Sequence, residues 1–227
     1  MKKFVSLRQA ITGFRELARA AHEPQHILPL LAHAEPRSLA ELNRMIEALP
    51  PLVPGADRAV PGEGPEGAAI ALVGEQPGDQ EEREGRPFVG PAGMLLNHAL
   101  KDAGIDRNEV YVTNAVKHFK YVQRGNRRLH QKPTASEIQR YRWWLFKELE
   151  FVHPRLVVAL GSTAIQSLAG KALPVSSARG EAQFDGYRGY VTVHPSYLLR
   201  IPDEADKRRA YAGFCHDLER IRELAAG

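Results

Sequence analysis

The hydrophobic positions along the chain alternate between short apolar runs and longer amphipathic stretches. The short runs predict strands at 68–73, 110–116, 156–160 and 190–193. The longer stretches predict helices at 92–103, 136–151, 163–169 and 204–224. Because this alternation is typical of βαβ units, we predict an α/β fold with a central, mostly parallel four-stranded sheet that is flanked by helices on both faces.

The region before the first predicted strand has a different pattern. Apolar residues recur at helical spacing over 7–48, and prolines interrupt this pattern. Five prolines and several glycines then follow within residues 49–67, a composition that does not sustain a helix or a central strand. We therefore predict a helical N-terminal extension and linker over 1–55 and an α/β domain over 56–227.

Composition and charge exclude only some classes of protein. The formal net charge is +4, which suits a polyanionic partner but is shared by many proteins without one. No apolar run is long enough to span a membrane and no secretory signal is present, so we expect a cytoplasmic protein, and a monomer. Cys215 is the single cysteine, which excludes an internal disulfide and any metal site built from several thiolates of this chain.

Polar side chains follow the first two predicted strands. Residues 74–78 are Gly-Glu-Gln-Pro-Gly, a tight turn that places Glu75 and Gln76 directly after the first strand. Asn114 follows the second strand. Ligands of a parallel sheet bind beyond the carboxyl ends of its strands, so we expect these side chains at one site. The alternatives are a solvated turn at 74–78 and an Asx turn at Asn114.

Aromatic, imidazole and basic candidates lie in three further segments. Phe88 precedes a helix that is predicted to begin at Pro91, and it is either a core residue or a stacking platform. His194 follows the fourth strand, and a turn, apolar residues and an arginine come after it. Residues 117–133 combine basic and aromatic side chains, which favours phosphate contacts and stacking over the alternative of a solvated charged loop.

With these motifs in view, the chain resembles the uracil-DNA glycosylase superfamily across about residues 62–224. Residues 74–78 resemble its first active-site motif and residues 194–196 its second. Residues 85–93 resemble the segment whose aromatic side chain stacks on the flipped base. The resemblance implies an enzyme of base excision repair that removes uracil from DNA, either single-stranded or double-stranded, by cleaving the N-glycosidic bond.

The resemblance also implies a role for each candidate. His194 would stabilise the departing uracil anion, and Glu75 would activate the nucleophile. Phe88 would stack on the uracil, while Asn114 and Gln76 would bind its polar edge. The predicted contacts with the rest of the DNA are Lys120, Arg127, Arg128, Ser196, Leu198, Leu199 and Arg200.

Within the superfamily, the chain resembles the UdgX branch in particular. Gln76 follows Glu75, and residues 124–130 are similar to the arginine-rich loop of that branch. In UdgX a histidine of this loop bonds covalently to the abasic sugar, and His130 occupies its position. Glu75 is therefore expected to act either on His130 or on a water molecule, and ordinary hydrolysis with turnover stays an alternative.

One departure from this resemblance concerns a metal cluster. UdgX and the family-four enzymes hold an iron–sulfur cluster through a Cys-x-x-Cys pair and a further cysteine. In this chain these three positions are occupied by Glu47, Pro50 and Tyr141. Only His118 stands at a position where a ligand of the cluster is possible. We therefore predict no cluster and no other cofactor, with the N-terminal helices or aromatic packing around Tyr141 stabilising that flank.

Two other classes of protein are weighed against a glycosylase. A non-catalytic module that binds single-stranded DNA accounts for the basic segment, but not for a carboxylate and a histidine at one sheet edge. A phosphotransferase could use the glycine-rich turns, but the chain has no Gly-Lys-Ser/Thr phosphate loop and no acidic pair for magnesium.

Overall fold

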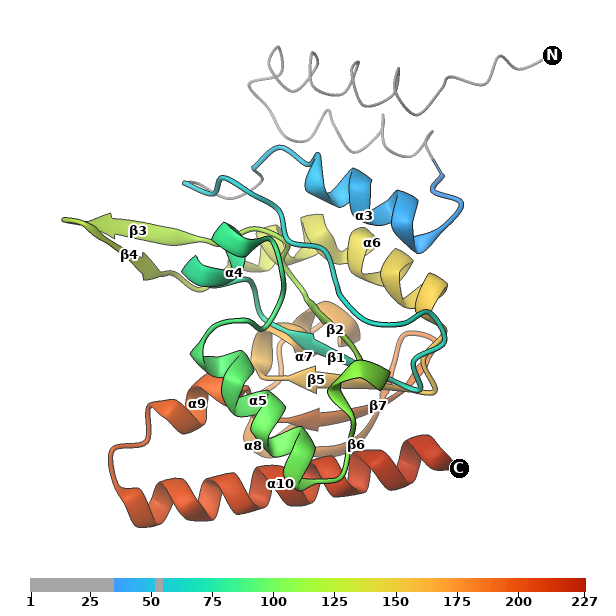
Figure 1. Ribbon diagram of the computed structural model, residues 1–227, viewed down its shortest axis with the longest axis vertical. Coiled ribbons are helices and arrows are strands. Elements are labelled where there is room, and N and C mark those ends of the chain that lie inside the picture. The colour runs from blue at the N-terminus through green and yellow to red at the C-terminus, as the bar shows by residue number, and fades with distance from the viewer. Residues whose placement is uncertain (1–34, 52–54) are drawn as a thin grey trace.

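A five-stranded sheet forms the centre of the computed structural model, which describes residues 35–51 and 55–227 (Figure 1). The strands lie in the order β2-β1-β5-β7-β6, and all neighbours are parallel except β6 and β7. Their bounds are β1 Ile70–Gly74, β2 Tyr111–Asn114, β5 Leu156–Leu160, β6 Gly180–Phe184 and β7 Tyr187–Thr192. The predicted mostly parallel sheet is confirmed.

The number of strands in the sheet is a correction, because β6 adds a fifth strand to the four that were predicted. Its first four residues alternate between partly exposed and exposed positions, only Phe184 at its end is buried, and Ala182 and Phe184 are its only apolar side chains, so the strand has no apolar run. A turn at Asp185 and Gly186 joins it to β7, and Gly186 has a φ of 81°. An Asp-Gly pair between two strands is a hairpin signal that could have identified this strand.

Helices cover both faces of the sheet. One hydrophobic cluster joins the sheet to α3, α6 and α7, and a second joins it to α5 and α10. Side chains of β1 alternate between the two clusters: Ala71 and Val73 belong to the first, and Ile70 and Leu72 to the second. The helices are α3 Leu39–Glu47, α4 Asp79–Glu84, α5 Pro91–Asp102, α6 Ala135–Val152, α7 Ser162–Ala169, α8 Val175–Ala178, α9 Pro195–Leu199 and α10 Glu204–Ala226, with a 3-10 turn at Arg107–Glu109.

The described part of the predicted N-terminal extension belongs to the core of the main domain. Leu42 and Ile46 of α3 are completely buried and lie in the same hydrophobic cluster as α6. The expected boundary at residue 55 therefore does not separate two cores, because α3 buries its apolar side against α6. The rest of the predicted extension, residues 1–34, lies outside the described residues.

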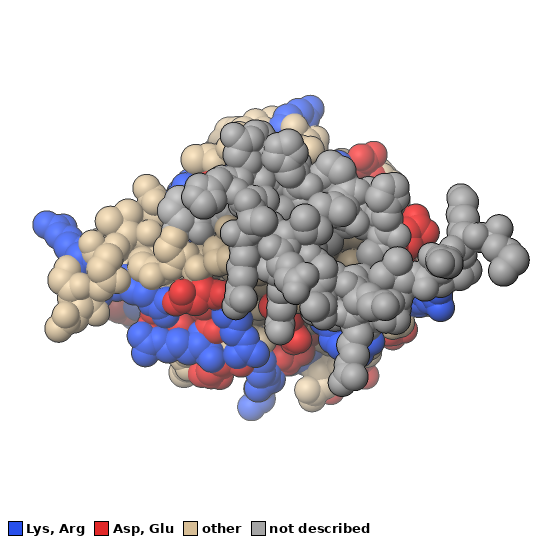
Figure 2. All heavy atoms as spheres, turned by 90° about the horizontal axis from the view of Figure 1, so that it is seen from above, with Lys and Arg blue, Asp and Glu red and all other residues tan. Residues whose placement is uncertain are grey.

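The basic segment forms a β-hairpin, which corrects the expectation of a loop. Strands β3 (Tyr121–Arg124) and β4 (Arg127–His130) pair antiparallel, and Gly125 in the turn has a φ of 58°. The hairpin projects from the body of the molecule (Figure 1), and Lys and Arg side chains mark the same end in the view from above (Figure 2). Tyr121 pairs with His130, which places His130 at the base of the hairpin.

Within residues 35–51 and 55–227, no helix is long and apolar enough to cross a membrane. The parallel strands instead determine where a site can form. β1, β2, β5 and β7 all end at the same edge of the sheet, and Gly74 is the register partner of Asn114 at that edge. The segments that follow these strands therefore converge there.

Candidate active site

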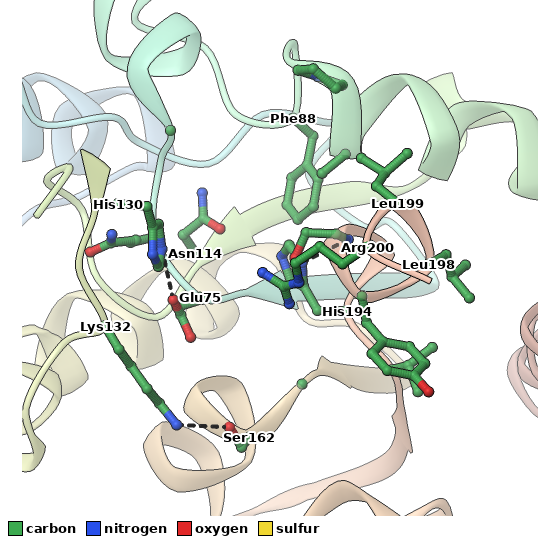
Figure 3. Close-up of a pocket in the computed structure, with 18 of the residues that line it drawn as sticks. Glu75, Phe88, Asn114, His130, Lys132, Ser162, His194, Leu198, Leu199 and Arg200 are labelled. Atoms are coloured by element: carbon green, nitrogen blue, oxygen red, sulfur yellow. Dashed lines mark hydrogen bonds and ion pairs between the residues drawn. The ribbon is translucent and has the colours of Figure 1, made fainter. Parts of the chain in front are cut away.

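A cavity of about 1250 Å³ lies at the carboxyl edge of the sheet (Figure 3). It is larger than the roughly 300–1,000 Å³ of a typical small-molecule site, so it has room for more than a single base. Residues at or just after the ends of four parallel strands contribute to its wall, together with the hairpin and with α5 and α9. The chemically important lining residues are Glu75, Phe88, Asn114, His130, Ser162 and His194.

Glu75 is one of three carboxylates that line the cavity, together with Asp79 and Glu81. Its Oε1 lies 2.9 Å from Nε2 of His130, and its Oε2 accepts a hydrogen bond of 2.5 Å from the hydroxyl of Thr163. Burial raises the pKa of Glu75, but the hydrogen bonds from His130 and Thr163, together with electrostatic interactions with His130 and His194, outweigh burial and hold the pKa below its ordinary value. Glu75 is therefore ionised at neutral pH and able to accept a proton.

His194 is a neutral imidazole whose tautomer follows from its contacts. Its Nδ1 accepts a hydrogen bond of 3.2 Å from the backbone N–H of Ser196, so the ring proton resides on Nε2. The hydroxyl of Ser196, a predicted DNA contact, lies 2.9 Å from the same nitrogen. Burial lowers the pKa of His194 to about 4, and the Arg200 cation contributes in the same direction, against the opposing effect of Glu75.

Phe88 and Asn114 approach each other over a glycine. A Cβ atom on Gly74 would lie 2.4 Å from Oδ1 of Asn114 and 2.6 Å from Cζ of Phe88, so only glycine permits this arrangement. Asn114 is almost completely buried at the end of β2, and the Phe88 ring stacks with His194 at a centroid distance of 6.1 Å. Phe88 also has a φ of 56°, a costly conformation for a bulky residue that is typical of functional sites.

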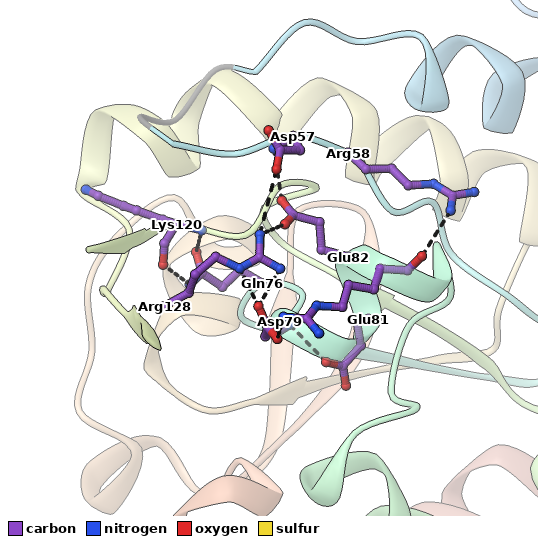
Figure 4. A network of polar contacts seen from close by, with 10 residues as sticks. Asp57, Arg58, Gln76, Asp79, Glu81, Glu82, Lys120 and Arg128 are labelled. Atoms are coloured by element: carbon purple, nitrogen blue, oxygen red, sulfur yellow. Dashed lines mark hydrogen bonds and ion pairs between the residues drawn. The ribbon is translucent and has the colours of Figure 1, made fainter. Parts of the chain in front are cut away.

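The side chain of Gln76 holds the hairpin (Figure 4), and the predicted contact of the Gln76 region with uracil stays a prediction. Its side-chain amide donates to the carbonyl oxygens of Lys120 and Gln131 at 3.1 and 3.2 Å. Its carbonyl oxygen accepts from the N–H of Lys120 at 3.2 Å. Both amide hydrogens of Gln76 are therefore used where β3 begins and β4 ends, and neither is available to a base.

Arg128 joins the hairpin to α4, and its predicted contact with DNA stays a prediction. Its guanidinium forms ion pairs with Asp79 and Glu82 of α4 (Figure 4). The same group lies over the rings of Tyr121 and Phe119, at 5.0 and 5.5 Å from their centroids. Because two carboxylates already neutralise this cation, it supports the position of the hairpin.

Two further predicted DNA contacts are buried. Lys120 is 6% exposed and pairs with Glu137 at 2.8 Å, so its charge is already matched. Leu198 is completely buried in the cluster around α5 and α10, so it cannot insert into DNA without unpacking the core. The predicted contacts that remain exposed are Arg127, Leu199 and Arg200.

Comparison with known proteins decides the family of the chain. The family model described as the uracil DNA glycosylase superfamily matches residues 61–219. The chain belongs to this superfamily. The Type-4 uracil-DNA glycosylase of Thermotoga maritima is 39% identical over 153 residues, which are 66% of this chain and 76% of the relative.

Relatives of two types within the superfamily share this similarity. The Type-4 uracil-DNA glycosylase of Sulfurisphaera tokodaii is 33% identical over 177 residues, 74% of each chain. The Type-5 uracil-DNA glycosylase of Pyrobaculum aerophilum is 35% identical over 160 residues, 62% of this chain and 67% of the relative. The matched family region contains the whole cavity but begins after α3.

Sequence reasoning missed two residues of this superfamily site. Gly74 was treated only as part of a turn, whereas its missing side chain admits Phe88 and Asn114. Thr163 follows β5 by three residues and bonds to Glu75. The rule that functional residues follow strands should have drawn attention to Gly161-Ser162-Thr163, because β5 is a central strand of the sheet.

The positions implied for an iron–sulfur cluster come together without thiolates. The hydroxyl of Tyr141 lies 2.6 Å from Nδ1 of His118, and Nε2 of His118 is buried without a hydrogen-bond partner among the described residues. Leu49, next to Pro50, lies in the same hydrophobic cluster as Tyr141. Cys215 is on α10, across the sheet from this contact. An iron–sulfur cluster requires several thiolates, so the side chains present do not fit one.

We predict that His194 stays neutral down to a pH well below that at which a histidine ordinarily gains its proton. Nuclear magnetic resonance of ¹⁵N-histidine should show the Nε2–H tautomer at pH 7 and titration near pH 4. Between about pH 6.5 and 4 the unfolded chain binds a proton at this histidine that the folded chain does not, so the free energy of unfolding should fall as the pH falls. His194→Asn assigns the signal, and a midpoint near 6.5 would contradict the buried neutral ring.

Proposed function

We propose that this protein removes uracil from DNA by cleaving the bond between the base and C1′ of the sugar. The observation that carries the proposal is the pairing of an ionised carboxylate with a neutral imidazole donor in one cavity. This bond breaks with positive charge on the sugar and negative charge on the base. Glu75 and His194 have the charge states that this distribution requires.

The base is expected to lie between an aromatic ring and a polar edge. Phe88 offers a face for stacking, and the buried amide of Asn114 can donate to O4 and accept from N3–H of uracil. Nε2–H of His194 would donate to O2, which takes up charge as the bond breaks. Leu199 and Tyr197 are 42% and 49% exposed beside the cavity and are suited to fill the gap left by a flipped nucleotide in duplex DNA.

Two nucleophiles are compatible with the position of Glu75. In the hydrolytic route, a water oxygen bonds to C1′, its proton passes to Glu75, and uracil leaves with the electron pair of the broken bond. In the covalent route, Nε2 of His130 bonds to C1′ and its proton passes to Glu75, while the bond from C1′ to N1 of uracil breaks and uracil leaves with the electron pair. The distance of 2.9 Å between these side chains and the resemblance to UdgX favour the covalent route.

We also propose that the protein works without an iron–sulfur cluster. The contact of His118 with Tyr141 and the packing of α3 on α6 would then support this flank. Purified protein should contain neither iron nor sulfide in stoichiometric amounts, and treatment with a chelator should leave its activity unchanged. Stoichiometric iron and sulfide would overturn this proposal.

Single substitutions test the glycosylase function. Glu75→Gln and His194→Ala should each lower the rate of uracil release about a hundredfold or more, because each removes a group that stabilises developing charge. Release is measured from labelled DNA, single-stranded and double-stranded, by scission in alkali. His216→Ala and Glu219→Gln, an exposed pair on α10, are the matched controls and should keep full activity. Full activity of both cavity variants would contradict the assignment.

The covalent route predicts a species that hydrolysis does not form. Wild-type protein mixed with uracil-containing single-stranded DNA should give a band on denaturing gels that survives heating. His130→Ala should abolish this band, because the nitrogen that bonds to C1′ is missing. Release of abasic DNA by the wild type without any such band would exclude the adduct and leave the hydrolytic route.

A further inference from the structure

The carboxylate of Glu75 has a different partner on each oxygen. Oε1 faces His130 on the projecting hairpin, where the imidazole side chain is 50% exposed. Oε2 faces Thr163 on α7, which is 1% exposed. We propose that Thr163 is a positioning residue for the reaction, whose hydroxyl holds one oxygen of Glu75 so that the other faces the nucleophile. This inference rests on the proposed function.

Among the residues that the structure describes, the hydroxyl of Thr163 has no other hydrogen bond that accounts for its direction. A threonine near a helix start often bonds to the backbone of its own helix. In α7 the capping position is Gly161, no side chain caps the helix, and the hydroxyl of Thr163 donates to a residue 88 positions earlier. A β-branched side chain has few rotamers in a helix, so α7 determines where this donor lies.

This donor matters because Glu75 is largely surrounded by protein. Burial raises its pKa, and the hydrogen bonds from His130 and Thr163, together with electrostatic interactions with His130 and His194, more than offset that effect. The titratable groups whose charges act on Glu75 are His130 and His194. Lys132 also lines the cavity, and its Nζ lies 3.1 Å from the Ser162 hydroxyl (Figure 3). Of the two residues that donate hydrogen bonds to Glu75, His130 titrates and lies on the hairpin, whereas Thr163 does neither.

The role of Thr163 is the same for both nucleophiles. Whether Glu75 receives a proton from water or from His130, Oε1 must be ionised and directed into the cavity. A bond from Thr163 to Oε2 meets both needs, because it favours the charged form and limits rotation of the carboxylate. The loss of this bond should therefore affect the chemical step more than the binding of DNA.

Four side chains at position 163 separate the hydroxyl from the methyl group. Thr163→Val keeps the shape and removes the hydroxyl, Thr163→Ser keeps the hydroxyl, and Thr163→Ala removes both. Here kcat is the single-turnover rate constant of uracil release at saturating protein, and KM is the half-saturating protein concentration, so that both apply to either route. We expect Val and Ala to lower kcat about tenfold with KM little changed, since a hydrogen bond to a charged group is lost. The acid limb of the pH profile of kcat should move to higher pH in both variants, and Ser should restore both properties.

Two further measurements separate this role from stability and from the proposed function. Ser167→Ala removes another buried hydroxyl from the same helix, one without a hydrogen-bond partner in the described structure, and should leave kcat and the pH profile unchanged. Titration of the Glu75 carboxyl by ¹³C nuclear magnetic resonance should show a higher pKa in Thr163→Val and Thr163→Ala.

The outcomes are distinct. Equal activity of the Ser and Ala variants, or a Val variant with the kcat and acid limb of the wild type, would overturn the role of Thr163. If Val does not fold, the comparison of Ser with Ala decides, because these two differ only in the hydroxyl. A wild-type protein that releases no uracil would overturn the proposed function, and the Glu75 titration would then decide by itself whether Thr163 holds the carboxylate.

Discussion

The ionised state of Glu75 is the condition on which the cavity depends, because burial by itself would favour the neutral acid. Two hydrogen-bond donors offset this effect, and each comes from a different part of the chain. Thr163 is placed by β5, the direct neighbour of β1 in the sheet, and His130 is placed by the hairpin. The order of the strands and the position of the hairpin therefore keep the Glu75 carboxylate ionised. This negative charge distinguishes a reactive cavity from an ordinary polar cleft.

The hairpin needs support of its own, because it projects from the domain with few neighbours. Gln76 supplies it at the base, through hydrogen bonds to the backbone where β3 begins and β4 ends. Arg128 supplies it along β4, through carboxylates on α4 and two aromatic rings. Removal of one member of such a network would leave a partly buried charge without a partner, which typically costs several kcal/mol. An amide and a guanidinium often bind DNA in other proteins. In this protein, these side chains of Gln76 and Arg128 hold His130 beside Glu75.

The flank formed by α3 and α6 is held by hydrophobic packing and by a buried hydrogen bond. Tyr141 and His118 form a direct hydrogen bond, and Leu42 and Ile46 of α3 are completely buried beside them in the same cluster. Burial of a leucine or isoleucine side chain contributes about 1.5–3 kcal/mol, so a few such residues supply substantial stabilisation. Such packing needs no thiolate, in agreement with a sequence that has one cysteine on the opposite face.

The sequence by itself determined the four parallel strands, the helices between them and the edge at which Glu75, Asn114 and His194 meet, because hydrophobic periodicity and strand ends are local properties. It did not determine β6, whose residues form no apolar run. Nor did it show that Gln76 and Arg128 are used within the protein, since an amide or a guanidinium suits a backbone, a carboxylate or a nucleic acid equally well. Only the tertiary structure decided which partner each polar group has, because that choice depends on distances between segments far apart in the chain.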